Sequence, residues 1–283
     1  MLKTLILATF VACSAAFVVP KTLPFVDSSL PITFKGVIAE PAPKVISNSA
    51  TYGFAIDFSV PATLQQLQAV RQAGYNVVFI RGYTPAGQGT FDTNSVTSLR
   101  NAYSAGLGIE VYMTPQPASS KQGYQQLDEV YNGMTTNGIT IRAIWIQVTS
   151  PANWPGTVQQ HINFINSIVA RARQYGLAVG IYTNNYDWSQ ITGGWNSVGN
   201  DVLLWYWNVL GGGTSGETPA DFSDFRSFGN WIAPSVKQFA QVEVVAGITV
   251  NRNVYTNAGA ELTSVSDKQE DKIVAGNLAL RIH

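Results

Sequence analysis

The sequence predicts an α/β fold, a single-domain, irregular TIM-like (β/α)5(β)3 barrel, and three observations support this prediction. Helical patterns end at glycines that recur at spacings of 32, 32 and 38 residues, namely Gly74, Gly106, Gly138 and Gly176. Each glycine is followed by an apolar, strand-like run, and one strand plus one helix fits such a spacing. After Tyr182 the strand-like runs continue but long helical patterns do not. Five βα units followed by three further strands account for this order.

The strands are nearly continuous apolar runs, which favours a parallel sheet covered on both faces. The five strands of the βα units are expected at 54–56, 77–80, 109–113, 141–148 and 177–182, and the last three at 202–209, 231–239 and 242–250. The helices between them are amphipathic. Active sites of such barrels lie where the parallel strands end, so the residues at those ends are the candidates for function.

The two ends of the chain differ in composition from the barrel. Lys3, a short apolar run over residues 5–12 and small residues at 14–16 predict a signal peptide over 1–16, and hence a secreted, extracellular protein. Residues 17–50 are rich in Pro, Ser and Val and are expected to form an N-terminal arm or short pro-region. The barrel is assigned to 51–255. Residues 256–283 are polar and charged and are expected to be a tail or a short surface helix.

Composition excludes several classes of function. Of the 283 residues 46% are hydrophobic and only 12% charged, and 17 Lys and Arg balance 17 Asp and Glu. A neutral chain has no field to attract nucleic acid or an anionic membrane, so neither is an expected partner. Two histidines are too few for most histidine-based chemistry, so we expect no metal and no cofactor. The one cysteine, Cys13, lies in the predicted signal peptide. Nothing in the sequence predicts an oligomer, so a monomer is expected.

The predicted strand ends carry aromatic, amide and hydroxyl groups and one carboxylate, Asp57. Such a surface suits a polar, uncharged ligand with apolar faces, such as a sugar. The residues expected to contact this ligand are Arg81, Tyr112, Tyr182, Trp205, Gln238 and Asn251. Two alternatives remain open. The aromatic side chains fill the barrel, as large aromatics commonly do, or Asp57 is a structural hydrogen-bond acceptor for Ser59 or Arg81.

These motifs, in this order, resemble glycoside hydrolase family 25, the Chalaropsis-type lysozymes, and in particular their nematode lysozyme-like branch. The resemblance covers roughly residues 52 to 255. It rests on residues that follow one another on successive predicted strands: Asp57-Phe58-Ser59, Arg81, Asp92 with Gly106-Leu107, Tyr112, Tyr182-Thr183, Leu204-Trp205 and Gln238-Phe239.

The resemblance implies a peptidoglycan ligand and cleavage of the β-1,4 bond next to N-acetylmuramic acid. It also implies a catalytic Asp-x-Glu on the fourth strand, together with the first-strand carboxylate, Asp57. Here that motif reads Gln147-Val148-Thr149, so Gln147 and Thr149 occupy the positions of the family's Asp and Glu. The family's late Asp-x-Asn reads Asn251-Arg252-Asn253. An amide and a hydroxyl do not act as general acids at the pH where glycosidases work.

Two hypotheses follow for the function. The first is a secreted lysozyme-like hydrolase, serving antibacterial innate defence or digestion, in which catalysis is rearranged. Asp187, which follows the fifth predicted strand, is then a substitute acid if its loop folds inward, and otherwise a cap of a helix or turn. The second is a non-catalytic pseudoenzyme that binds glycan with the same fold.

Overall fold

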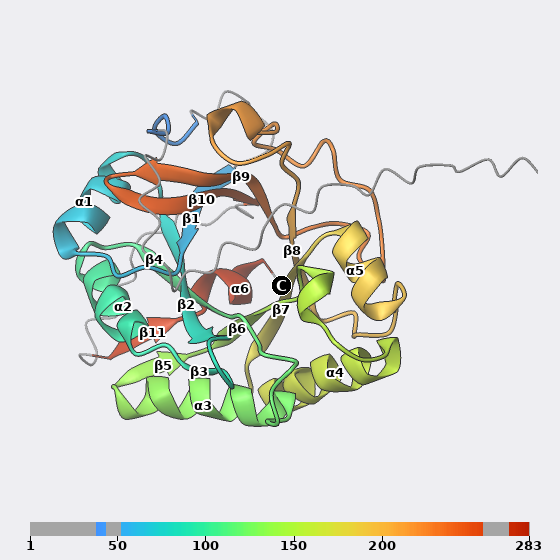
Figure 1. Ribbon diagram of the computed structural model, residues 1–283. Coiled ribbons are helices and arrows are strands. Elements are labelled where there is room, and N and C mark those ends of the chain that lie inside the picture. Colours follow the sequence, from blue (N-terminus) through green and yellow to red (C-terminus); the bar gives the residue numbers. More distant parts are fainter. Residues whose placement is uncertain (1–37, 44–51, 257–271, 283) are drawn as a thin grey trace, which may run out of the picture.

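The computed structural model describes residues 38–43, 52–256 and 272–282, and these form a barrel of strands with helices packed around it (Figure 1). The predicted signal peptide at 1–16 and most of the predicted arm lie outside the described residues. Secretion therefore stays a prediction. No helix in the described ranges combines the length and apolar character needed to cross a bilayer.

The predicted five βα units and three further strands are present. In chain order the elements are β1 (Tyr52–Phe58), α1 (Leu64–Gln72), β2 (Val77–Thr84), β3 (Thr90–Phe91), α2 (Asn94–Ser104), β4 (Gly108–Met113), α3 (Gly123–Thr136), β5 (Ile139–Ile141), β6 (Ala143–Gln147), α4 (Val158–Gln174), β7 (Ala178–Thr183), α5 (Asn185–Thr192), β8 (Leu203–Trp207), β9 (Val236–Val245), β10 (Ile248–Thr256), β11 (Ile273–Ala275) and α6 (Asn277–Arg281). Of these, β3, β5, β11 and α6 are additional to the predicted units and strands. Short 3₁₀ turns lie at Pro151–Asn153 and Thr214–Gly216.

The main sheet closes on itself, which confirms the predicted barrel. Its strand order is β1-β10-β9-β8-β7-β6-β4-β2, β1 also pairs with β2, and β3 adds to the edge of β2. Neighbours from β1 through β9 are parallel, whereas β10 runs antiparallel to both β9 and β1. Five helices connect β1, β2, β4, β6, β7 and β8, and none connects β8, β9 and β10. This is the (β/α)5(β)3 arrangement.

Local sequence explains where the long helices begin and end. Thr63 and Thr157 cap the starts of α1 and α4, each in a reciprocal pair with the glutamine three residues on. At the other ends, the four recurring glycines all adopt the left-handed backbone, with φ between 70° and 94°. After α4, for example, the Leu177 amide donates to the Ala172 carbonyl at 3.0 Å, which closes the last turn.

The last two barrel strands differ from their predicted positions. β9 begins at Val236 and β10 begins at Ile248, each about five residues later than expected. The two strands form a hairpin through Ala246 and Gly247, and both of these residues have positive φ. Because β10 is antiparallel, it is the beginning of this strand, and not its end, that brings Asn251 beside Asp57. Hydropathy alone does not report strand direction.

A long connection, residues 208–235, covers the part of the barrel that has no helices. Two buried cations on the outer face of the last strands hold it. Lys237 on β9 is fully buried and donates to Asp224 Oδ2 at 2.6 Å and to the Pro219 carbonyl at 2.7 Å. Arg252 on β10 pairs with Glu217 at 2.7 Å and with Glu243 at 3.1 Å. These ion pairs add to apolar packing, in which Phe222 and Phe225 lie against the ring of Tyr206 on β8.

For residues 256–283 the sequence predicted a tail or a short surface helix, and the described part of this segment contains a short strand and a short helix. Within the described part of it, β11 pairs in parallel with β5, and α6 packs against the barrel, with Leu278 and Ala279 buried. The Leu278 amide donates to Glu110 Oε1 at 2.8 Å, inside the barrel. The polar composition on which the prediction was based belongs mostly to residues 256–271, of which only Thr256 is described.

The barrel interior is filled by its own apolar cluster, separate from the cluster between strands and helices. Phe79, Trp145 and Trp205 form its middle layer, with ring centroids 4.5 to 6.0 Å apart. Gly180 on β7 faces the Trp145 ring so closely that any Cβ there would overlap it. The fold therefore places a packed aromatic floor beneath the strand ends.

Candidate functional site

Asp57, at the end of β1, is held by three side-chain amides. Its Oδ1 accepts hydrogen bonds from Gln238 Nε2 and Asn253 Nδ2, and its Oδ2 accepts one from Asn251 Nδ2, all at 2.8 Å. The residue is only 4% exposed. Burial raises the pKa of the Asp57 carboxyl, and the three amide hydrogen bonds, which favour the charged form, oppose that rise.

The residues beneath Asp57 fix which way these amides point. Trp205 Nε1 donates to Asn253 Oδ1 at 2.8 Å, so the NH₂ group of Asn253 faces Asp57. The Tyr182 hydroxyl donates to Gln238 Oε1 at 2.8 Å, with the same consequence for Gln238. The partners of Asp57 are therefore amides in set orientations. The alternative in which Ser59 or Arg81 holds Asp57 is wrong: Arg81 pairs with Asp92 at 3.0 Å, and Ser59 hydrogen-bonds to Tyr112.

The prediction that Trp205 contacts the ligand is wrong. Its side chain is fully buried and lies against the rings of Phe79, Tyr182, Tyr112 and Trp145. Gln238 is also fully buried, so it acts on a ligand only through Asp57. The alternative, in which the aromatics fill the barrel, is correct for Trp205. Tyr112 and Tyr182 are each 7% exposed and lie at the edge of this packing.

Gln147 and Thr149 lie together at the end of β6. Gln147 Nε2 donates to Thr149 Oγ1 at 3.0 Å, and Gln147 Oε1 accepts from Thr114 Oγ1 at 2.6 Å. Trp154 Nε1 donates to the Thr149 carbonyl at 3.0 Å and holds the loop that follows. All these groups are neutral. The side chains of Gln147 and Thr149 thus offer hydrogen bonds but no acid.

Asp187, near the start of α5, folds inward. Trp207 Nε1 donates to its Oδ2 at 3.3 Å, and the Ser150 backbone amide also donates to its carboxylate. Burial raises the pKa of Asp187 to about 6, against these two hydrogen bonds, which lower it. The cap of α5 is Asn184, whose Oδ1 accepts from the Asp187 amide at 2.7 Å. The alternative that assigned the capping role to Asp187 is therefore wrong.

Partly exposed polar side chains lie around Asp57 at the same end of the barrel. They come from the ends of the parallel strands and from the β9–β10 hairpin: Ser59, Arg81, Thr114, Gln147, Thr149, Asn184, Trp207, Gln241 and Asn251. We call these residues the polar ring. Arg81 is its only charged member, and its charge is paired with Asp92. A ring of amides, hydroxyls and one indole matches uncharged hydroxyl and acetamido groups better than it matches an ion.

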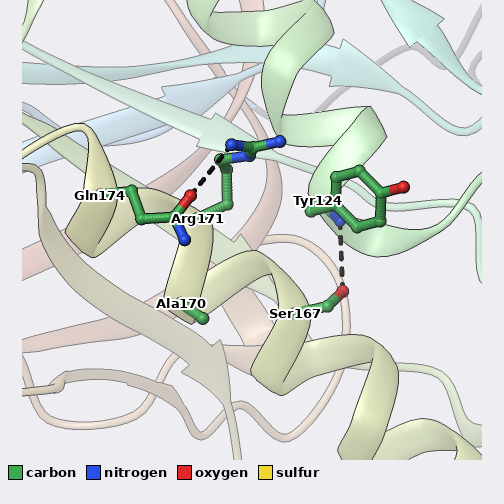
Figure 2. A pocket seen from close by; sticks show the side chains of 5 residues that line it. All are labelled: Tyr124, Ser167, Ala170, Arg171 and Gln174. Atoms are coloured by element: carbon green, nitrogen blue, oxygen red, sulfur yellow. Dashed lines mark hydrogen bonds between the residues drawn. The ribbon is translucent and has the colours of Figure 1, made fainter.

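A separate cavity of about 300 Å³ lies on the outer surface between α3 and α4 (Figure 2). The residues that line it hydrogen-bond to one another. The Tyr124 backbone amide on α3 donates to Ser167 Oγ on α4 at 3.2 Å, and Arg171 donates to Gln174 Oε1 at 2.9 Å. Arg171 also pairs with Asp128 on α3 at 3.0 Å. No residue of the polar ring lines this cavity, so it is not the candidate site. The described residues also contain no group of three or more His, Cys, Asp or Glu side chains suited to a metal ion.

Sequence reasoning did not choose Asn253 or Trp207 as site residues, although Asn253 belongs to the Asn251-Arg252-Asn253 motif. Asn253 lies two residues after Asn251 on β10, so the period of two in a strand places both side chains on one face. That signal was available once Asn251 was chosen. Trp207 lies two residues after Trp205 for the same reason, and it contacts Asp187 from the next strand.

The closed (β/α)5(β)3 barrel is the fold of solved family 25 lysozymes. The family GH25 lysozyme from Aspergillus fumigatus superimposes with a TM-score of 0.58 at 17% identity, over 75% of this chain and 98% of that one. At that identity the likeness shows the fold alone.

The family follows from the sequence comparisons. The family model described as Lysozyme-like protein 1 matches residues 48–239. Lysozyme-like protein 7 of Caenorhabditis elegans is 64% identical over 266 residues, which is 94% of this chain and 92% of that protein. Probable GH family 25 lysozyme 2 of Dictyostelium discoideum is 30% identical over 201 residues, 71% of this chain and 89% of that protein. The chain belongs to the lysozyme-like proteins of glycoside hydrolase family 25.

Proposed function

We propose that this protein acts on bacterial peptidoglycan, and that it binds the glycan strand at the polar ring around Asp57, across the β-1,4 bond next to N-acetylmuramic acid. The observation that carries the proposal is a single amide-held carboxylate at the carboxyl end of the barrel, among neutral hydrogen-bonding groups. Membership of a lysozyme family supports the same ligand.

The neutrality of the ring suits this ligand. Glycan strands present hydroxyl and acetamido groups, and amide side chains both donate to and accept from such groups. Gln147 is the clearest contact residue, because it is partly exposed and its amide is already ordered by Thr114 and Thr149. An ordered side chain loses less entropy when it binds.

Binding is tested with purified peptidoglycan and a Gln147→Ala variant. One hydrogen bond is worth about 0.5–1.5 kcal/mol, so the Kd should rise roughly threefold to tenfold. The matched control is Gln174→Ala, because Gln174 lies in the outer cavity between α3 and α4 (Figure 2) and should leave the Kd unchanged. If the parent does not sediment with peptidoglycan, or if both variants bind like the parent, the polar ring is not the glycan site.

A second candidate is glycan binding without hydrolysis. The observation in its favour is that Gln147 and Thr149 occupy the positions of the family's catalytic Asp and Glu and hydrogen-bond to each other as neutral groups. Measuring the release of reducing ends from the same peptidoglycan preparation separates this candidate from the first.

The predicted signal peptide supports a secreted protein, and peptidoglycan as ligand is compatible with antibacterial innate defence or with digestion of bacteria. Expression in a secreting host tests this. A mature chain beginning near Phe17 in the medium, identified by mass spectrometry, is the expected result. A chain retained in the cell with residues 1–16 intact would contradict it.

A further inference from the structure

One buried carboxylate beside the polar ring, Asp187, has no part in holding Asp57. Its carboxylate accepts the backbone N–H of Ser150, the residue that directly follows Thr149. The acid group of Asp187 therefore lies within hydrogen-bonding distance of the backbone at the place where the family carries its catalytic glutamate. The chain has no carboxyl group on residue 149, and the carboxylate that contacts the backbone of the next residue comes from the first turn of α5.

The contact between Asp187 and Ser150 depends on an unusual backbone. Ser150 adopts the left-handed conformation, with φ 58° and ψ 73°. This conformation is unfavourable for a residue with a Cβ, and such strain persists where the surrounding structure requires it. Here it accompanies a backbone N–H that is directed at a carboxylate, while the Trp207 indole donates to the same carboxylate from β8 at 3.3 Å.

Asp187 and Asp57 belong to one connected arrangement. Trp207, which donates to Asp187, is the register partner of Gln238 across β8 and β9, and Gln238 donates to Asp57 at 2.8 Å. Both carboxylates raise the pKa of Tyr182 beyond the rise due to burial, so the Tyr182 hydroxyl lies within the field of each. Both acids therefore influence the same tyrosine at this end of the barrel.

We infer that Asp187 is the general acid of this protein, and that it donates the proton to the glycosidic oxygen of the bound glycan in place of the missing glutamate. The inference rests on the proposed function. The two carboxylates have different surroundings, as an acid and a charge-stabilising group require. Burial raises the pKa of both carboxyls, but three amide donors oppose the rise at Asp57 and only two donors oppose it at Asp187, whose pKa is raised to about 6.

In the reaction, the Asp187 carboxylic acid gives its proton to the oxygen that joins the two sugars. The bond from C1 to that oxygen breaks, and its electron pair leaves with the oxygen as a hydroxyl group. The Asp57 carboxylate stabilises the positive charge left on the ring. A water molecule adds to C1 and gives a proton to the Asp187 carboxylate, which restores the acid. In the net reaction, one water molecule cleaves one glycosidic bond, and each of the two sugar products gains a hydroxyl group at the cleaved position.

The experiment compares the parent with Asp187→Asn and Asp187→Glu at pH 6. Peptidoglycan binding and the release of reducing ends are measured separately. We expect turnover in the parent, and a loss of about 10² to 10⁴ in kcat for Asp187→Asn, the usual contribution of a general acid, with the Kd within twofold of the parent. Asp187→Glu keeps an acid and should retain more turnover than Asp187→Asn. Asp201→Asn, which changes an exposed partner of Arg173, is the matched control and should behave as the parent.

A second substrate distinguishes proton donation from positioning. An aryl glycoside of an N-acetylated oligosaccharide has a leaving group that departs without a proton, so Asp187→Asn should lose less than tenfold on it. An equal loss on both substrates would mean that Asp187 only positions other groups, and the inference would be wrong. A parent that binds peptidoglycan but releases no reducing ends would also overturn the inference and leave the proposed binding intact. A parent that binds no peptidoglycan would overturn the proposed function itself.

Discussion

Both ends of the barrel contain a buried carboxylate, and they are closed in different ways. At the carboxyl end, Asp57 is held by three side-chain amides, and partly exposed polar residues surround it. At the opposite end, Glu110 accepts from Trp145 Nε1 and from the Leu278 amide, each at 2.8 Å, and α6 packs against it. In Figure 1, α6 lies among the strands of the barrel.

The comparison shows that burial and a raised pKa do not by themselves identify an active site. Burial raises the pKa of Glu110 to about 7, yet α6 of the same chain occupies the position that a ligand would need. What distinguishes Asp57 is its surroundings, in which the partners are side chains at strand ends and polar neighbours remain accessible. The two ends should therefore respond differently to mutation.

The largest effect is expected at the closed end, for Glu110→Ala. The change leaves the Trp145 indole N–H and the Leu278 amide without their acceptor inside the barrel. Each unpaired buried donor costs about 1–3 kcal/mol, so the free energy of unfolding should fall by about 2–6 kcal/mol. Urea denaturation measures it. Asp201→Ala, which removes an exposed ion pair, should cost less than about 1 kcal/mol.

Glu110→Ala also tests the functional contrast. Below the temperature at which the variant unfolds, its Kd for peptidoglycan should equal that of the parent, since the aromatic layer separates Glu110 from the polar ring. A loss of stability below about 1 kcal/mol would show that Glu110 does not hold α6. A changed Kd in a fully folded sample would show that the two ends are coupled.

The second prediction concerns pH. Glu110 has a pKa of about 7 in the fold and an ordinary value of 4.5, so the folded state binds its proton more tightly. Its contribution to stability is complete below pH 4.5 and is lost as the pH rises through 7. Asp187, at about 6 against 3.8, acts in the same direction.

The protein should therefore be less stable at pH 7.5 than at pH 5. Between these two pH values Glu110 alone accounts for about 2 kcal/mol of the difference, which is most of what its whole pKa shift supplies. Thermal unfolding of the parent and of Glu110→Gln at the two pH values measures this, because the variant has nothing to ionise at that position. Equal pH dependence in both proteins would exclude Glu110 as the source.

Much of the closed barrel could be predicted from the sequence, and much of its lower end could not. The glycine-ended helices and the apolar runs predicted the five βα units, because both signals are local. The packing of α6 under Glu110 depends on contacts between residues more than 100 positions apart, for example Glu110 and Leu278. No periodicity reports such contacts.

The sequence predicted which residues lie at the candidate site better than it predicted what each of them does there. Asp57, Gln147, Thr149 and Asn251 do lie at one end of the barrel. The roles of the aromatic residues were harder to predict, because the same side chain can stack on a sugar or pack in a hydrophobic core. Only its exposure in the fold distinguishes the two roles. Trp205 is in the core. The role of Asp187 had two interpretations, a substitute acid or a helix cap, because the direction of its side chain depends on how the segment after β7 folds.

The smallest effect is expected at the open end, for Tyr182→Phe. The change removes the hydroxyl that donates to Gln238 Oε1, but Gln241 Nε2 donates to the same oxygen, so the acceptor keeps a partner. The Gln238 amide then stays turned toward Asp57. The free energy of unfolding should fall by only about 0.5–1.5 kcal/mol, the net worth of one hydrogen bond, and the Kd for peptidoglycan should stay within twofold. At the closed end, Trp145 and Leu278 each donate to a different oxygen of Glu110, so each depends on that carboxylate. At the open end, Gln238 Oε1 accepts from both Tyr182 and Gln241, so the loss of one donor leaves the other. A loss above about 3 kcal/mol, or a tenfold weaker Kd, would mean that the tyrosine hydroxyl alone orients Gln238, and that the open end tolerates no more change than the closed one.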